Sequence, residues 1–250
     1  MYIINKMKNT IFLMEKNELI NFVNETLIKE YGIPERAKNK PDPLDLLIAT
    51  ILSQNTNDNN SYKAYLNLKS KINSFKDIID MPIEELETLI KTAGLTKQKA
   101  KTIKKFMLFL SEKYNKFDLN FINKFTDDEV IDFLVQNEGI GVKTASCVLM
   151  FSLYRDICPV DTHVHRLVNR VGIVNTKTPD KSFYILNIDF PKGIAHSFHT
   201  NLIKHGRKIC RPKNPFCGDC VLKDICKFEL KNSLKKTQND EERILLLDKI

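Results

Sequence analysis

Residues 138–145 of this 250-residue chain read Glu138-Gly139-Ile140-Gly141-Val142-Lys143-Thr144-Ala145 and separate two segments whose apolar residues recur at helical spacing. Two glycines around one apolar residue predict a tight turn between helices. At the start of the second helix the backbone N–H groups have no intrahelical partners, and the dipole is positive. We therefore expect Gly139 and Gly141 to present a phosphate-binding turn. Its position between helices, rather than after a strand, argues against a dinucleotide-binding fold.

Lys143 is expected in the first turn of that second helix, where the dipole disfavours a cation and helps to lower the pKa of the amine. A neutral amine is a nucleophile. Asp161 follows eighteen residues later, directly before another apolar helical pattern, where its carboxylate is well placed as an N-cap. From these local patterns alone, a surface lysine and a purely structural cap remain as alternatives.

Helical periodicity extends over almost the whole chain. Thr126 and Glu129 have the spacing of a capping box at the start of a helix. The helix expected from Pro43 to about Ser53 is apolar on nearly all sides, which predicts burial at the centre of a helical domain. Sustained alternation of apolar and polar residues is absent from the sequence, so we predict an all-α fold.

Four of the six cysteines lie within seventeen residues, at the spacing C-x6-C-x2-C-x5-C. Four thiolates can hold a zinc ion or an iron–sulfur cluster, whereas two disulfides would suit a secreted chain. Zinc ribbons usually carry two separated CxxC pairs, and the single pair here favours a [4Fe-4S] cluster bound by Cys210, Cys217, Cys220 and Cys226. Cys147 and Cys158 have no ligand spacing and are expected to be ordinary buried thiols.

The chain is basic, with 39 Lys and Arg against 31 Asp and Glu and a sequence pI of about 9.0. Ten basic residues against three acidic ones lie between residues 201 and 236, which favours a polyanionic partner. Arg211 and Lys213 project from a proline-stiffened segment between the first two cysteines and could reach a phosphate backbone; a solvated loop that merely closes around the cluster is the alternative. Residues 231–250 are expected to form a detachable C-terminal tail.

Hydrophobic residues make up 42% of the chain and charged residues 28%, as in ordinary globular proteins. The apolar runs are too short for a membrane span, and residues 1–14 lack the features of a secretory signal. We therefore expect a cytoplasmic, nucleoid-associated protein that is not secreted and has no membrane partner.

Taken together, these features resemble the helix-hairpin-helix DNA glycosylases with an iron–sulfur cluster, and most of all the endonuclease III family. The resemblance covers roughly residues 41–228. It depends on ordered blocks at residues 51–56 (ILSQNT), 90–95 (IKTAGL), 139–145 (GIGVKTA), 159–163 (PVDTH) and 205–207 (HGR), together with the four cysteines at the family's own spacing.

This resemblance implies a two-domain, all-α architecture. A six-helix barrel domain that includes the helix-hairpin-helix would span residues 35–155, and an iron–sulfur cluster domain would combine residues 1–34 and 156–230. Substrate would lie in a cleft between the domains, with Lys143 and Asp161 facing each other across it.

The implied activity is that of a bifunctional DNA glycosylase/AP lyase, which removes oxidised pyrimidines from duplex DNA and acts as a monomer. Lys143 matches the nucleophile that forms a Schiff base and cuts the strand by β-elimination, and Asp161 matches its partner carboxylate. Base extrusion requires a gap filler and a wedge. Gln54 and Leu95 match these residues; a satisfied polar helix residue and a core leucine are their respective alternatives.

Three positions depart from the family pattern, namely Asn137 and Glu138 in place of Leu-Pro and Thr96 in place of an aromatic residue. An acid beside a phosphate site is unfavourable unless it points away or caps a helix, and the edge of the lesion pocket is expected to differ. Two other functions remain: a monofunctional adenine or thymine mismatch glycosylase, and a non-catalytic iron–sulfur DNA-binding protein. Lys143 argues against both.

Overall fold

A computed structural model describes residues 15–235, and within this range every regular element is helical. The predicted all-α fold is therefore confirmed for the described part of the chain. The chain divides into two compact units. We call residues 36–155 the hairpin unit and residues 15–35 with 156–235 the cysteine unit, and each is described by itself.

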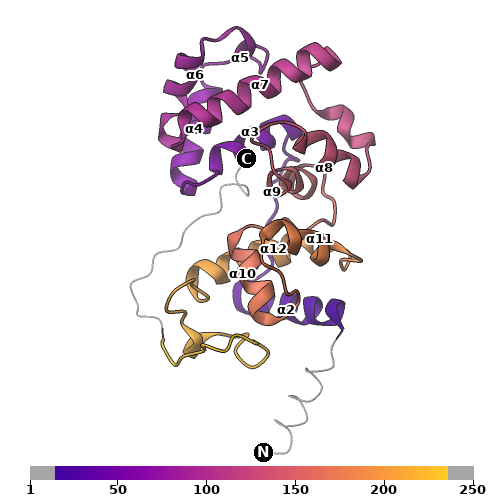
Figure 1. Ribbon diagram of the computed structural model, residues 1–250, viewed down its shortest axis with the longest axis vertical. Helices are drawn as coiled ribbons and strands as arrows, with labels where there is room; N and C mark the ends of the chain where they lie inside the picture. Colours follow the sequence, from indigo (N-terminus) through magenta and orange to yellow (C-terminus); the bar gives the residue numbers. More distant parts are fainter. Residues whose placement is uncertain (1–14, 236–250) are drawn as a thin grey trace, which may run out of the picture. The chain divides into compact units, whose positions relative to one another are not determined.

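The hairpin unit is built around α3 (Pro43–Ser53), which contacts α4, α7, α9 and η3 (Figure 1). Every residue of α3 from Pro43 to Leu52 is buried except Asp45, as its apolar sequence predicts. The other elements are α4 (Asp58–Lys69), α5 (Asp77–Asp80), α6 (Ile83–Leu89), η1 (Lys91–Ala93), α7 (Thr96–Tyr114), η2 (Asn120–Lys124), α8 (Asp127–Val135), α9 (Val142–Cys147) and the π-helical turn η3 (Val148–Ser152).

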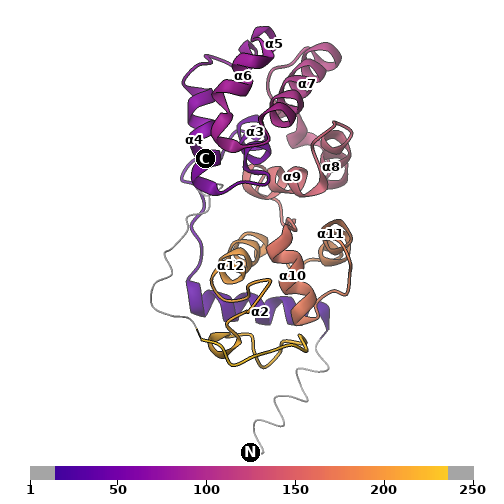
Figure 2. The same cartoon turned by 60° about the vertical axis from the view of Figure 1, so that its left-hand side comes forward.

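The cysteine unit contains α2 (Lys16–Tyr31), α10 (Thr162–Val171), α11 (Pro179–Asn187), α12 (Ala195–Lys208) and the short 3₁₀ turn η4 (Cys217–Asp219). Helix α12 packs against both α2 and α10 (Figure 2). The segment after α12 has little regular structure and runs along these helices. Its position places the four clustered cysteines beside α10 and α12.

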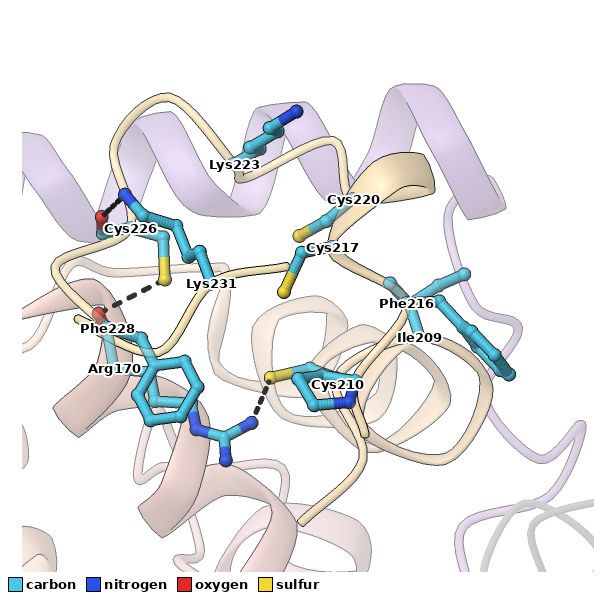
Figure 3. Close-up of a pocket in the computed structure, with 11 residues that line it drawn as sticks. Arg170, Ile209, Cys210, Phe216, Cys217, Cys220, Lys223, Cys226, Phe228 and Lys231 are labelled. Atoms are coloured by element: carbon cyan, nitrogen blue, oxygen red, sulfur yellow. Dashed lines mark hydrogen bonds between the residues drawn. The ribbon is translucent and has the colours of Figure 1, made fainter. Parts of the chain in front are cut away.

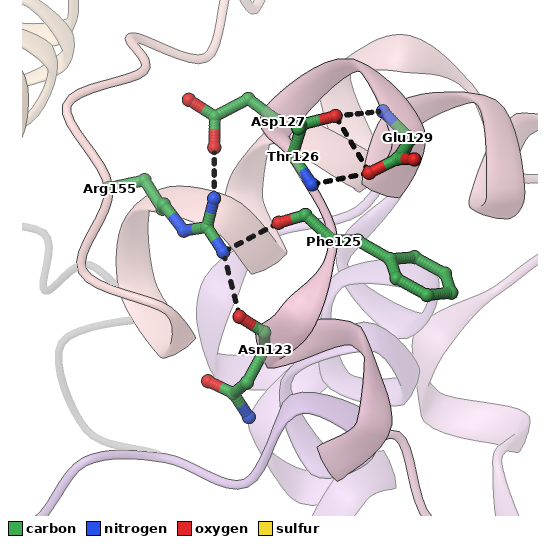
Figure 4. Close-up of polar contacts among 6 residues, drawn as sticks. All are labelled: Asn123, Phe125, Thr126, Asp127, Glu129 and Arg155. Atoms are coloured by element: carbon green, nitrogen blue, oxygen red, sulfur yellow. Dashed lines mark hydrogen bonds and ion pairs between the residues drawn. The ribbon is translucent and has the colours of Figure 1, made fainter.

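The start of α8 shows how local sequence sets a helix boundary. Thr126 Oγ1 accepts a hydrogen bond from the Glu129 N–H, and the Glu129 carboxylate accepts one from the Thr126 N–H (Figure 4). The predicted capping box is confirmed. Arg155 pairs with Asp127 at 2.7 Å in the next position of the same helix and also donates to the Phe125 carbonyl. The last residue of the hairpin unit is thereby anchored to the first turn of α8.

Within residues 15–235 no helix is long and apolar enough to cross a membrane. Cys147 and Cys158 are fully buried, as expected for ordinary core thiols. The interpretation of residues 1–14 and most of the predicted tail at residues 231–250 lie outside the described residues.

Candidate functional site

The predicted turn joins α8 to α9, and its two glycines have different roles. Gly139 has a φ of +88°, and a Cβ there would lie 2.2 Å from Thr102 Oγ1. Backbone conformation and packing both require glycine at this position. Gly141 is the N-cap of α9 with an ordinary φ, and a Cβ would meet no atom within 4 Å. The backbone at Gly141 is thus exposed and open to the approach of a ligand.

Lys143 is the second residue of α9, in the first helical turn, as predicted. Its side chain is half-buried, and its carbonyl accepts a hydrogen bond from Ser146 Oγ. The helix continues directly into η3, all of whose residues are buried. The backbone that carries Lys143 is therefore fixed by a buried segment immediately after it.

Asp161 is the N-cap of α10, which confirms the structural part of its prediction. Its Oδ1 accepts a hydrogen bond from the Val164 N–H at 2.8 Å. Lys143 belongs to the hairpin unit and Asp161 to the cysteine unit. Their predicted pairing in one active site stays a prediction.

Gln54 lies against the glycine turn. It is the C-cap of α3, and its Nε2 donates to the Gly139 carbonyl and to Thr144 Oγ1, each at 3.2 Å. The structure thus brings together Gln54, Gly139 and Thr144, which directly follows Lys143. In this conformation Gln54 is a polar side chain whose amide is satisfied by two hydrogen bonds, as the alternative interpretation expects. The role of Gln54 as a gap filler on DNA stays a prediction.

Leu95 is 51% exposed and has a left-handed backbone, with φ of 48°, between η1 and α7. The alternative of a core leucine is therefore wrong. A large apolar side chain held out in a strained conformation is the geometry required of a wedge. The preceding Gly94, with φ of +68°, allows the chain to turn there.

Lys99 connects the Gln54 and Leu95 segments and was not singled out by the sequence patterns. Its side chain is 1% exposed, and Nζ donates to the carbonyls of Leu52 and Ala93, both at 2.8 Å. These carbonyls lie two residues before Gln54 and Leu95, respectively. Burial lowers the pKa of Lys99 to about 8. Its burial could have been inferred from the sequence, because Lys99 lies on the apolar face of α7, one helical turn before Ile103.

The two departures before the turn have structural explanations. Asn137 Nδ2 donates to the carbonyls of Phe133 and Leu134 and so caps the end of α8. Glu138 is exposed and pairs with Lys105 at 2.6 Å and Lys101 at 3.6 Å, both on α7. Its hydrogen bond to Lys105, and then the charge of Lys101, lower the pKa of the Glu138 carboxyl.

The four clustered cysteines line one open pocket that contains about 310 Å³ of empty space, solvent included. In Figure 3 their sulfur atoms surround a common interior. Two of the sulfurs have nitrogen atoms within hydrogen-bond distance: Arg170 Nη1 donates to Cys210 Sγ at 3.3 Å, and His205 Nε2 lies 3.4 Å from Cys220 Sγ. Burial raises the pKa of Cys220 to about 12 and also raises that of Cys226.

All six cysteines are within the described residues, and none forms a disulfide. In the same range no three His, Cys, Asp or Glu side chains converge closely enough to hold a single metal ion. Four sulfurs around an open interior, with the Arg170 guanidinium next to Cys210, form a donor set that suits a [4Fe-4S] cluster and also a zinc ion.

The segment between the first two cysteines is held mainly by Arg170, which donates to the carbonyls of Arg211 and Pro212. The Arg211 guanidinium lies over the Phe216 ring, 4.5 Å from its centroid. Lys213 is exposed. The segment thus presents cationic groups at the surface of the cysteine unit, as the solvated-loop and DNA-contact interpretations both require.

Comparison with known proteins places these features in one family. Residues 48–190 match the model described as HhH-GPD superfamily base excision DNA repair protein. Endonuclease III of Thermotoga maritima is 34% identical over 208 residues, which cover 83% of this chain and 93% of the relative.

Solved structures agree with the sequence comparison. A non-covalent endonuclease III–DNA complex is 29% identical, with a TM-score of 0.72, and covers 86% of this chain and 96% of that one. A trapped endonuclease III–DNA covalent intermediate is 28% identical, with a TM-score of 0.71, and covers 86% and 97%.

Proposed function

The chain belongs to the endonuclease III family of HhH-GPD base excision DNA repair proteins, and from this premise we propose that Lys143 is its nucleophile and Asp161 the partner carboxylate. The protein is a DNA glycosylase with AP lyase activity. This activity is favoured over mismatch-only excision and over DNA binding without catalysis. The observation that carries the residue assignment is the position of Lys143, directly after a glycine turn, in a chain similar to one trapped covalently on DNA.

In the first step the neutral amine of Lys143 attacks C1′ of the damaged nucleotide. The N-glycosidic bond breaks, and the base leaves with the bonding electrons and takes up a proton. Positive character develops on the sugar during this step, and the Asp161 carboxylate stabilises it electrostatically. The N-cap hydrogen bond from Val164 holds that carboxylate at the start of α10.

Ring opening of the sugar gives a protonated Schiff base between Lys143 and C1′. The iminium makes a C2′ proton acidic, and its removal expels the 3′ phosphate oxygen by β-elimination. Hydrolysis of the remaining imine then returns the free amine. Cutting therefore follows from the same lysine that displaced the base.

The substrate is duplex DNA with an oxidised pyrimidine or an abasic site. Leu95 acts as the wedge and Gln54 as the gap filler when the damaged nucleotide leaves the stack. Their support is the exposed, left-handed position of Leu95 and the contact of Gln54 with the glycine turn. The N–H groups at Gly139 and Gly141 contact a phosphate, and Arg211 and Lys213 contact the backbone from the cysteine unit.

Cys210, Cys217, Cys220 and Cys226 hold a [4Fe-4S] cluster whose contribution is structural. When bound, the cluster supplies positive charge at the iron atoms that compensates the four thiolates. The hairpin unit then corresponds to the six-helix barrel domain, and the cysteine unit to the cluster domain. The protein works on DNA inside the cell as a monomer.

Borohydride trapping tests the assignment. Wild-type protein incubated with a duplex containing one oxidised pyrimidine and then reduced is expected to give a covalent protein–DNA adduct. Lys143→Gln removes the amine without removing the side chain's polarity and is expected to abolish the adduct and strand cutting. Lys204→Gln, at a lysine of α12, serves as the charge-matched control. Undiminished trapping by Lys143→Gln would show that another amine is the nucleophile.

A further inference from the structure

The first half of α7 carries an unusual concentration of positive charge. Between residues 96 and 105 there are five lysines and no acidic residue. Lys99 is buried, and Lys104 donates to the Met81 carbonyl. The three exposed lysines are spaced four residues apart and therefore lie in one row along the helix surface: Lys97, Lys101 and Lys105.

This lysine row connects two predicted DNA contacts of the hairpin unit. It begins two residues after the exposed Leu95 and ends beside the glycine turn, where Lys105 and Lys101 pair with Glu138. With 1.5 Å rise per residue, the row is about 12 Å long, close to the axial length of three or four nucleotides of one strand.

The lysine row lowers the stability of α7 rather than adding to it. Like charges four residues apart repel each other, and Lys97 lies in the first turn, where the dipole disfavours a cation. Among residues 15–235, the lysine row forms its ion pairs with Glu138, through Lys101 and Lys105. A polyanionic ligand would compensate these charges.

We propose that Lys97, Lys101 and Lys105 form a track for phosphates of the DNA strand next to the lesion, and that Glu138 is an internal counter-ion which DNA displaces. The inference depends on the proposed function, since it extends the DNA contacts of the hairpin unit. All three lysines and Glu138 are exposed, so phosphate can reach them.

Exchange of the carboxylate for phosphate is physically easy because exposed ion pairs of this kind contribute little to stability. The exchange nevertheless opposes binding, since it separates Glu138 from the lysines and leaves a carboxylate beside a phosphate. Glu138 therefore weakens DNA binding. We expect it to favour release of the product, which carries the same phosphates as the substrate.

The test is a salt series of equilibrium binding between full-length protein and a duplex with a tetrahydrofuran abasic analogue. K101Q/K105Q is expected to weaken binding about tenfold at about 50 mM salt, and to reduce the slope of log affinity against log salt by about 1.8. The charge-matched control K71Q/K116Q replaces two exposed lysines of the same unit outside the row and is expected to keep the wild-type affinity and slope.

E138Q provides a second measurement of opposite sign and is expected to tighten binding several-fold at low salt. In the K101Q/K105Q background the same substitution should give little of this gain, because both lysines that pair with Glu138 are already replaced. An equal gain in both backgrounds would overturn the counter-ion role. Thermal unfolding of every variant verifies that the compared proteins are folded.

The outcomes separate this inference from the function on which it depends. Wild-type binding together with a K101Q/K105Q variant that matches K71Q/K116Q in affinity and slope overturns the phosphate track and leaves the function intact. Failure of the wild type to bind the damaged duplex in a salt-dependent way contradicts the proposed function itself, and the track with it.

Discussion

The glycine turn with the start of α9 (residues 136–145) and the cysteine loop (residues 210–226) are both predicted to contact DNA, yet the chain holds them in different ways. The glycine turn is held by packing: Ile140 is buried, Gly139 lies against Thr102, and Gln54 bonds to the turn. The cysteine loop has one three-residue 3₁₀ turn, and its main side-chain support comes from Arg170.

Of these two predicted DNA-contact regions, we expect only the cysteine loop to need a cofactor for its structure. The glycine turn follows from side-chain packing that the chain supplies itself. The cysteine loop encloses thiols whose burial raises the pKa of Cys220, so it is poorly suited to hold four thiolates without a compensating metal centre. We therefore expect loss of iron to disturb the cysteine loop and leave the glycine turn intact. Substitutions in the hairpin unit should have the reverse selectivity.

Loss of iron from the proposed cluster should have the largest effect. In Cys220→Ser, or after chelation under reducing conditions, the cysteine loop is expected to lose its structure and more than about 5 kcal/mol of stabilisation, on the scale of structural metal sites. Hydrogen exchange should become fast at residues 210–226 while residues 136–145 remain protected. Cys147→Ser, at a buried cysteine outside the pocket, is the control. If the cysteine loop kept its native protection without iron, it would not depend on a metal centre for its structure, and the proposed difference between the two regions would be wrong.

Gly139→Ala should break the glycine turn without touching the cysteine loop. A side chain there requires a left-handed conformation and collides with Thr102 Oγ1, so we expect a loss of about 2–4 kcal/mol in the free energy of unfolding. Gly141→Ala is the matched control, since its Cβ meets no atom; stability should change by less than about 0.5 kcal/mol. Urea denaturation measures both. Equal stability of the two variants would show that Gly139 is not under this constraint.

Lys99→Met tests the polar connection between the Gln54 and Leu95 segments. The carbonyls of Leu52 and Ala93 lose their buried donor, so stability at pH 7 should fall by about 1–3 kcal/mol. Lys97→Met, at an exposed lysine of the same helix, controls for the loss of one charge.

The pH dependence of Lys99→Met has a defined sign. Burial lowers the pKa of Lys99 from 10.5 to about 8. Between these pH values the unfolded state binds more protons than the folded state, so wild-type stability gains from this group as pH rises. The variant lacks the gain, and its deficit relative to wild type should widen from pH 8 to pH 10.5. A constant deficit across this window would contradict the lowered pKa of Lys99.

The smallest expected effect concerns the start of α8, which leads into the glycine turn. Thr126→Ala removes one side of the capping box and should lower stability by about 1 kcal/mol. Thr126→Ser retains the hydroxyl and should restore most of it. Chemical denaturation of both variants provides the measurement, and a loss as large in the serine variant would assign the effect to the methyl group.

Several features could be predicted because their causes are local. The N-cap role of Asp161, the capping box at Thr126 and the buried helix from Pro43 each depend on residues within one or two turns. Lys99 could not be predicted in this way, because its two acceptors come from segments that are 47 and 6 residues away. Glu138 appeared unfavourable beside a phosphate site until α7 supplied Lys101 and Lys105 as its partners.

The amino-acid sequence alone determined the helical class, the glycine turn, the four-cysteine cluster and the family, since these depend on spacing along the chain. The exposure of Leu95, the hydrogen bond from Gln54 to the glycine turn and the pairing of the lysine row with Glu138 became visible in the folded chain. Burial and pairing depend on surfaces that come together only when the chain folds. Residues that are distant in sequence then determine each other's solvent exposure and ion-pair partners.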